Sequence, residues 1–225
     1  MSKNLILGNR EILFVIIFCG CVFSTNVLSG HVAIAQNQTG TGFKDGGDKA
    51  KLKLALRDLW DDHILYTRNY IISAAGNLSD ADAVAKRLLK NQEDIGNAIK
   101  PYYGEKAGDN LTGLLKGHIL GAVEILKDSM NGNTSGASEA EKKWYNNANE
   151  IAVFLSTANP NWSKEDLKNM LDEHLRLTKS EATARLSGDY AADIAAFDKI
   201  KKQAMEMSDT LANGIIDQFP EKFSS

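Results

Sequence analysis

Hydrophobic side chains recur every three or four residues over most of the chain, from about residue 51 to residue 219. This spacing places them on one face of an α-helix, whereas no stretch shows the strict alternation of a β-strand. The first long helix is expected from Lys51 to Ala75, and Gly76-Asn77 should end it. The pattern predicts an all-α protein, more specifically a duplicated up-and-down helical bundle.

Capping and breaking residues divide the remaining pattern into further helices. A shorter helix is expected to begin at Ser79, which can form a capping box with Asp82, and Pro101 and Gly104 interrupt the chain after it. We expect four core helices, with an additional long helix and short connecting helices around them. The later helices are expected from Lys106 to Met130, from Ser138 (capped with Glu141) to Asn159, from Ser163 (capped with Asp166) to Gly188, and from Asp189 to Phe219.

The N-terminus has the features of a secretory signal. Lys3 and Arg10 precede an apolar run from Ile12 to Phe23, and Ala33-Ile34-Ala35 offers a small-x-small cleavage pattern. We expect a signal peptide at residues 1–35, a flexible linker at 36–50 and one helical-bundle domain at 51–220. The protein would then be exported, to the periplasm, the cell surface or the medium. An uncleaved N-terminal anchor is the alternative.

Composition narrows the kinds of function. A net charge of −3 gives no reason to expect a nucleic-acid partner. The two cysteines, Cys19 and Cys21, both lie in the expected signal peptide. The exported part would therefore have no disulfide and no thiolate ligand, and a metal would have to bind to histidine, methionine, carboxylate or amide groups.

An internal repeat defines the candidate site. The segment Leu56–Arg68 aligns without a gap to Leu167–Lys179, which matches His63 with His174, and Leu115–Glu124 aligns to Ile200–Asp209, which matches His118 with Gln203. We interpret this as two related units, at about 51–131 and 163–219, joined by a linking helix at 138–158. If both units fold alike, the bundle core contains one polar layer, formed by His63, His118, His174 and Gln203.

Imidazole nitrogens are ligands for transition metals, so this layer is a candidate site for zinc or copper, while haem fits less well. Thr67 and Thr178 lie one turn after their histidines and could hydrogen-bond the rings, and Met170 lies one turn before His174. A satisfied structural layer and an acid–base catalytic site remain alternatives. Trp60 and Asn147 are further candidate neighbours, because Trp60 precedes His63 on the same face and Asn147 follows Trp144 in a polar, aromatic run.

Sharper catalytic motifs are missing from the chain. A di-iron bundle needs Glu three residues before His, where Trp60, Leu115 and Leu171 stand instead. Neither a zincin motif nor a phosphate-binding loop occurs. Further along the His174 face, Glu181 and Arg185 are spaced for an ion pair.

The chain resembles a poorly characterised family of bacterial and archaeal helical-bundle proteins. Three patterns carry this resemblance: Leu59-Trp60-x-x-His63-x-x-x-Thr67-Arg68, Lys143-Trp144-Tyr145-x-Asn147-Ala148 with Ile151-Ala152-x-Phe154-Leu155-Ser156, and Phe197-Asp198-x-Ile200 with Met207-x-Asp209-x-Leu211-x-x-Gly214-Ile215. Members are sometimes labelled acetylglutamate kinase or glycosyltransferase, activities that normally need an α/β nucleotide-binding architecture.

From the sequence we therefore expect non-catalytic binding of a metal, a small molecule or an envelope protein. The alternatives are a hydrolase or transferase that uses one of the core histidines, or a purely structural bundle.

Overall fold

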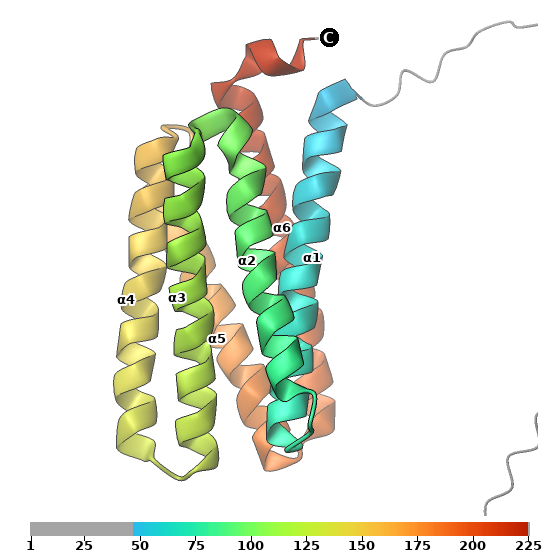
Figure 1. Cartoon of the computed structure of the whole chain (residues 1–225), viewed down its shortest axis with the longest axis vertical. Coiled ribbons are helices and arrows are strands. Elements are labelled where there is room, and N and C mark those ends of the chain that lie inside the picture. The colour runs from blue at the N-terminus through green and yellow to red at the C-terminus, as the bar shows by residue number, and fades with distance from the viewer. Residues whose placement is uncertain (1–46, 225) are drawn as a thin grey trace, which may run out of the picture. The chain divides into compact units, whose positions relative to one another are not determined.

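The computed structural model describes residues 47–224, and these residues form six long α-helices and one short 3-10 helix (Figure 1). No β-strand occurs within this range, so the prediction of an all-α bundle is confirmed. The helices are α1 (Gly47–Ala75), α2 (Ala81–Tyr103), α3 (Glu105–Met130), α4 (Thr134–Ala158), α5 (Lys164–Ser187) and α6 (Tyr190–Gln218), and the short helix is η1 (Pro220–Phe223).

The six helices form a closed up-and-down bundle. Each helix packs against the next in the chain, and α6 packs back against α1 (Figure 1). Short turns join the helices, so consecutive helices are antiparallel, and α1, α3 and α5 run in one direction. The bundle therefore consists of three helical hairpins, α1–α2, α3–α4 and α5–α6. This differs from the expected four core helices with short connecting helices.

Several predicted boundaries change. Helix α1 begins at Gly47, so the last four residues of the expected linker are helical. The expected short second helix has 23 residues and accommodates Pro101 in its last turn. Asp80 precedes this helix without a side-chain cap, so the predicted Ser79–Asp82 capping box is wrong. Proline is tolerated there because only one backbone hydrogen bond is lost close to the end of the helix.

Helix caps explain where α4 and α5 begin. The fourth helix starts before the predicted Ser138, because the Asn133 side chain accepts a hydrogen bond from the Gly136 amide at 3.1 Å and caps it earlier. At α5 the prediction is confirmed, since Ser163 Oγ accepts a hydrogen bond from the Asp166 amide at 3.3 Å.

The expected signal peptide, and the linker up to residue 46, lie outside the described residues. From residue 47 onward, no helix has the length and hydrophobicity needed to cross a membrane.

The buried positions repeat from hairpin to hairpin. On the first helix of each hairpin they recur at intervals of 55 and then 56 residues, and on the second helix at intervals of 56. Each hairpin therefore presents a similar inner face to the core. Buried sets that share this spacing are Leu56, Leu111 and Leu167; Ile64, Ile119 and Leu175; Leu88, Trp144 and Ile200; and Ile99, Leu155 and Leu211.

Helices α2 and α3 approach closely where two glycines face each other. A Cβ atom added to Gly96 would lie 2.6 Å from the Gly108 carbonyl oxygen, and one added to Gly108 would lie 2.6 Å from the Gly96 carbonyl oxygen. We expect Gly96→Ala to lower the free energy of unfolding by about 1–3 kcal/mol, because both the Thr112 side chain, whose Oγ1 would lie 2.0 Å from the added Cβ, and the Gly108 backbone must move. Urea denaturation would measure this loss.

Gly113 provides the matched control for Gly96. It lies in the middle of α3, and an added Cβ would meet no atom within 4 Å. Gly113→Ala should therefore raise the free energy of unfolding by about 0.5–1 kcal/mol. Equal effects of the two substitutions would contradict the close approach of α2 and α3.

Candidate metal centre

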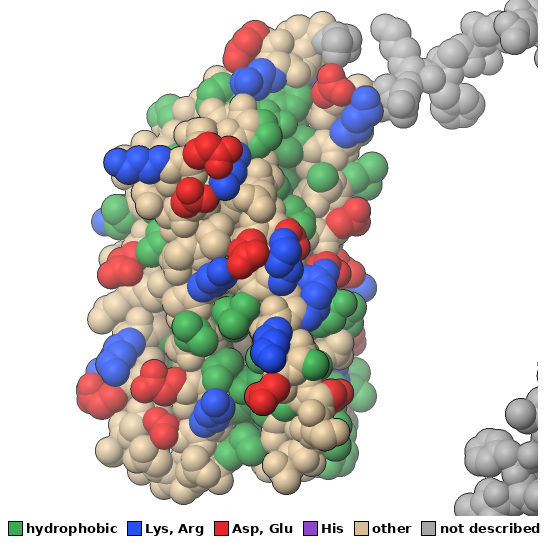
Figure 2. Space-filling view, in the orientation of Figure 1, with side chains coloured by type: hydrophobic (Ala, Val, Ile, Leu, Met, Phe, Trp, Pro, Cys, Tyr) green, Lys and Arg blue, Asp and Glu red, His purple; other side chains and the backbone are tan. Residues whose placement is uncertain are grey.

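Three histidines meet in the interior of the bundle. His63, His118 and His174 lie near the middle of α1, α3 and α5, and their side chains are 3%, 4% and 4% exposed. No histidine is visible on the face drawn in Figure 2, where charged side chains of both signs are scattered among hydrophobic and other side chains. The ring centres of His63 and His174 are 5.7 Å apart, and those of His118 and His174 are 6.3 Å apart. The structure thus brings together the three histidines expected from the sequence.

An amide side chain on α4 orients His118. Asn147 Nδ2 donates to the Leu114 carbonyl at 3.1 Å, so Asn147 Oδ1 must be the atom that faces His118 Nδ1, at 3.2 Å. An amide oxygen only accepts hydrogen bonds, so Nδ1 of His118 carries the proton and donates it. In a neutral ring the other nitrogen, Nε2, then has a free lone pair.

Gln203 on α6 orients His174 in the same way. Its Nε2 donates to the Met170 carbonyl at 2.9 Å, and its Oε1 accepts from His174 Nδ1 at 3.1 Å. The two histidine–amide pairs even have the same separation of 29 residues along the chain. Gln203, expected as a fourth ligand, therefore has its oxygen and its amino group engaged in positioning His174. Met170 takes part through its backbone carbonyl.

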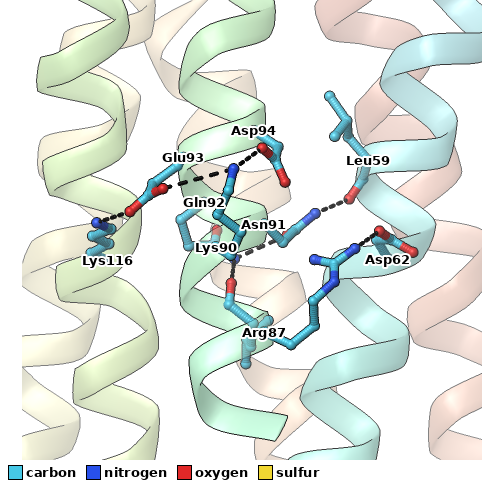
Figure 3. A network of polar contacts seen from close by, with 10 residues as sticks. Leu59, Asp62, Arg87, Lys90, Asn91, Gln92, Glu93, Asp94 and Lys116 are labelled. Carbon is cyan, nitrogen blue, oxygen red and sulfur yellow. Dashed lines mark hydrogen bonds and ion pairs between the residues drawn. The ribbon is translucent and has the colours of Figure 1, made fainter. Parts of the chain in front are cut away.

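The first hairpin has a related but incomplete arrangement. Asn91 Nδ2 donates to the Leu59 carbonyl at 2.9 Å, as Asn147 and Gln203 do in their hairpins (Figure 3). Here, however, Asn91 Oδ1 accepts from Gln92 Nε2 at 3.0 Å. His63 Nδ1 and Gln92 Oε1 are both buried without a hydrogen-bond partner. His63 is therefore the least firmly held of the three rings.

All three imidazoles are neutral at pH 7. Burial lowers the pKa of His118 to about 3, and it also lowers the pKa values of His63 and His174, because a charged ring loses its hydration in the core. The amides of Asn91 and Gln92 partly oppose the lowering of the His63 pKa. Neutral imidazole is also the form that binds metals.

The residues around the rings have mostly structural roles. Thr67 Oγ1 donates to the His63 carbonyl at 2.7 Å and Thr178 Oγ1 to the His174 carbonyl at 2.9 Å. These hydroxyls therefore bond the backbone, and the amides, rather than the threonines, set the tautomers. Trp60 packs edge-on against His63, with ring centres 5.3 Å apart. Trp144 stacks on His118 at 5.2 Å and donates to the His118 carbonyl at 2.9 Å.

His118 is the counterpart of His63 and His174 in the fold, and Gln203 is not. His118 lies on the first helix of its hairpin, as His63 and His174 do, whereas Gln203 lies on a second helix. The alignment of His118 with Gln203 therefore paired helices with different places in the fold. The sequence analysis missed Asn91 and Gln92. The 56-residue spacing that links Asn91, Asn147 and Gln203 was the signal that could have identified Asn91.

The three rings do not form a coordination site in this structure. Between residues 47 and 224, no group of three or more His, Cys, Asp or Glu side chains is arranged so that it could hold a metal ion as it stands. Two imidazoles on one metal, with bonds of about 2.0 Å, have ring centres about 5–6 Å apart. The His63–His174 distance of 5.7 Å falls within this range, and the His118–His174 distance of 6.3 Å lies just above it.

A buried cluster of ion pairs lies beyond the histidines, toward the C-terminal end of α5. Arg68 Nη1 bonds Glu181 Oε1 at 2.5 Å and Asp193 Oδ1 at 2.6 Å, and Arg185 Nη1 lies 3.4 Å from Asp193 Oδ2. The expected pair between Glu181 and Arg185 is wrong, because each binds a partner on another helix. Both carboxylates are almost fully buried, so this cluster is a structural tie between α1, α5 and α6.

Comparison of the chain with protein-family models, with curated proteins and with solved structures finds no match.

Proposed function

We propose that the histidine layer binds one transition-metal ion, zinc or copper, through Nε2 of His63, His118 and His174, and that the protein is a non-catalytic metal-binding protein. The main support is the pair of tautomers that Asn147 and Gln203 impose. Both amides hold Nδ1–H and leave Nε2 unprotonated. Metal-binding histidines are usually held by such a hydrogen bond from the second ring nitrogen.

The lone pairs of the imidazoles are available to a ligand. Within the described range, the side-chain hydrogen bonds of His118 and His174 involve Nδ1, so Nε2 of each ring is free to bind. A metal ion would satisfy these lone pairs simultaneously. The unsatisfied buried atoms of the layer are His63 Nδ1 and Gln92 Oε1, and leaving a buried polar atom without a partner costs about 1–3 kcal/mol.

Binding requires the rings to move toward one ion. For the pair of His118 and His174, whose ring centres are 6.3 Å apart, an approach of less than about 1 Å reaches the spacing of two imidazoles on one metal. His63 can turn more freely, because its Nδ1 has no partner in the structure. If His63 rotates toward Gln92, its Nδ1–H can donate a hydrogen bond to Gln92 Oε1, so that both unpaired atoms gain a partner. His63 would then have its proton on Nδ1, as His118 and His174 do.

The nature of the ion depends on charge. The layer contains no carboxylate, so a bound ion would keep its full charge within an apolar core, and the penalty for burial grows with that charge. Soft, monovalent copper and divalent zinc both accept imidazole nitrogen. They are therefore the two ions to compare.

The test is a titration of the metal-free protein with Zn²⁺ and, under anaerobic reducing conditions, with Cu⁺. We expect one ion per chain by elemental analysis after gel filtration, together with a higher melting temperature, because a ligand that binds only the folded state stabilises it. If neither ion stays bound and neither changes the melting temperature, the proposal is wrong and the histidine layer is structural.

A further inference from the structure

A second feature of the core is a cavity next to the histidine layer, which we call the lower cavity. Its volume is about 90 Å³, and it lies one helical turn beyond the histidines, toward the C-terminal ends of α1, α3 and α5. Trp144 separates it from His118 on one side. The walls closest to the histidine layer and just beyond it are formed by Thr67, Ile71, Ala122, Leu126, Thr178 and Ala182.

The walls of the lower cavity are mainly apolar. The hydroxyl protons of Thr67 and Thr178 are already used in hydrogen bonds to the carbonyls of His63 and His174. The one charged side chain in the lining, Lys179, is paired with Glu141 at 2.6 Å. An occupant would therefore find no unpaired charge, and a charged molecule would lose its hydration without compensation.

The lower cavity is open to solvent at one end. Ser129 at the end of α3 and Thr183 and Leu186 near the end of α5 line it and are exposed. These helix ends lie at the bottom of Figure 1. A small molecule can therefore enter without unfolding of the bundle.

The volume limits the size of an occupant. A dry cavity of about 150 Å³ lined by apolar side chains holds benzene, which has six heavy atoms. By proportion, 90 Å³ holds about three or four heavy atoms. On the other side of the histidine layer lies a second, wholly apolar cavity, which we call the upper cavity and which is lined by residues that include Trp60, Leu115 and Leu171. Its volume of about 40 Å³ is too small for such a molecule.

We propose that the lower cavity binds a small, uncharged, largely apolar molecule of about three or four heavy atoms. This site is separate from the metal proposal and does not require a metal. The two sites are nevertheless neighbours. Apart from Trp144, the side chains that separate them, Thr67, Ala122 and Thr178, are small, whereas Trp60, Leu115 and Leu171 are bulky on the opposite side.

The test uses cyclopropane as the probe and methyl NMR of the metal-free full chain as the readout. We expect shifts that saturate with concentration at methyl groups of the lower cavity, such as those of Ile71, Ala122 and Ala182. Methyl groups of the upper cavity, such as those of Ile151 and Leu167, should not shift. Acetate, a charged molecule of similar size, should shift neither set.

Replacing either of two alanines on α5 by leucine provides a matched pair of variants. Ala182 lines the lower cavity and Ala184 does not. Because leucine would fill much of the space, Ala182→Leu should weaken cyclopropane binding at least about tenfold, whereas Ala184→Leu should leave it unchanged. The proposal is overturned if cyclopropane causes no saturable shift, if acetate binds equally well, or if the shifts map to the upper cavity. These wild-type measurements decide the matter even if Ala182→Leu does not fold, and none of them depends on zinc or copper binding.

Discussion

Replacing His174 by alanine is expected to weaken binding of Zn²⁺ or Cu⁺ by more than about 100-fold. His174 lies closest to both other rings, so its loss leaves His63 and His118 as two ligands without a third between them. Loss of a group that merely orients a ligand typically costs 10–100-fold in affinity, and loss of a ligand itself should cost more. Competition with a chromophoric chelator would measure the affinity.

Two further variants distinguish the loss of a metal ligand from changes to the residues around it. Gln203→Met has a similar volume but cannot accept the proton of His174 Nδ1, so it should weaken metal binding about 10–100-fold. Thr178→Ala removes a buried hydroxyl that bonds only the His174 backbone carbonyl, so it should leave the affinity unchanged. If Thr178→Ala and His174→Ala weakened binding equally, the effect would reflect general damage to α5 and not ligation.

The largest loss of stability is expected from Arg68→Met. Arg68 is the shared partner of Glu181 and Asp193, whose side chains are 2% and 1% exposed. The substitution preserves much of the side-chain bulk against Phe197 but leaves both carboxylates without their main counter-ion. Removing one partner of a buried ion pair typically costs about 3–5 kcal/mol. Urea denaturation at pH 8 should show a loss of this size.

The pH dependence of this loss provides an internal check. Burial raises the pKa of Glu181 to about 7, even with Arg68 in place, and without Arg68 it should rise further. A carboxyl whose pKa is higher in the folded than in the unfolded state destabilises the fold above that pKa and recovers as the pH falls. The loss caused by Arg68→Met should therefore be smaller at pH 5 than at pH 8.

The exposed pair of Arg57 with Asp209 provides the control for Arg68. Its geometry is good, with Nε to Oδ1 at 2.7 Å, but its side chains are 47% and 34% exposed. Exposed ion pairs contribute little because water already solvates both groups. Arg57→Met should have almost no effect, and a loss equal to that of Arg68→Met would show that burial does not determine the cost.

Most of the fold could be predicted from hydrophobic spacing. The six helical segments, most of their C-terminal ends and the Ser163 cap follow from local signals. The errors concern starts of helices, where several residues compete to cap the same turn: Asn133 takes the place expected for Ser138, and the chain enters α1 at Gly47 instead of Lys51. Such choices depend on the geometry of the turn before each helix.

The candidate site could be predicted only in part. The three histidines were identifiable because each lies on an apolar helical face. The hydrogen-bond partners of His118 and His174 were not, because Asn147 and Gln203 belong to neighbouring helices and lie 29 residues from the rings that they bond. The sequence also suggested that Thr67 and Thr178 orient the rings, yet in a helix a threonine hydroxyl readily bonds the carbonyl one turn back.

By itself, then, the sequence determined that residues 51–219 form a helical bundle with histidines on its inner faces. Local periodicity is sufficient for that, because it depends only on neighbours along one helix. Only the tertiary structure decided that the helices form three equivalent hairpins, that amides set the tautomers of His118 and His174, and that Arg68 ties two buried carboxylates together. These features depend on which helices pack side by side, and many pairings of similar amphipathic helices satisfy the same periodicity.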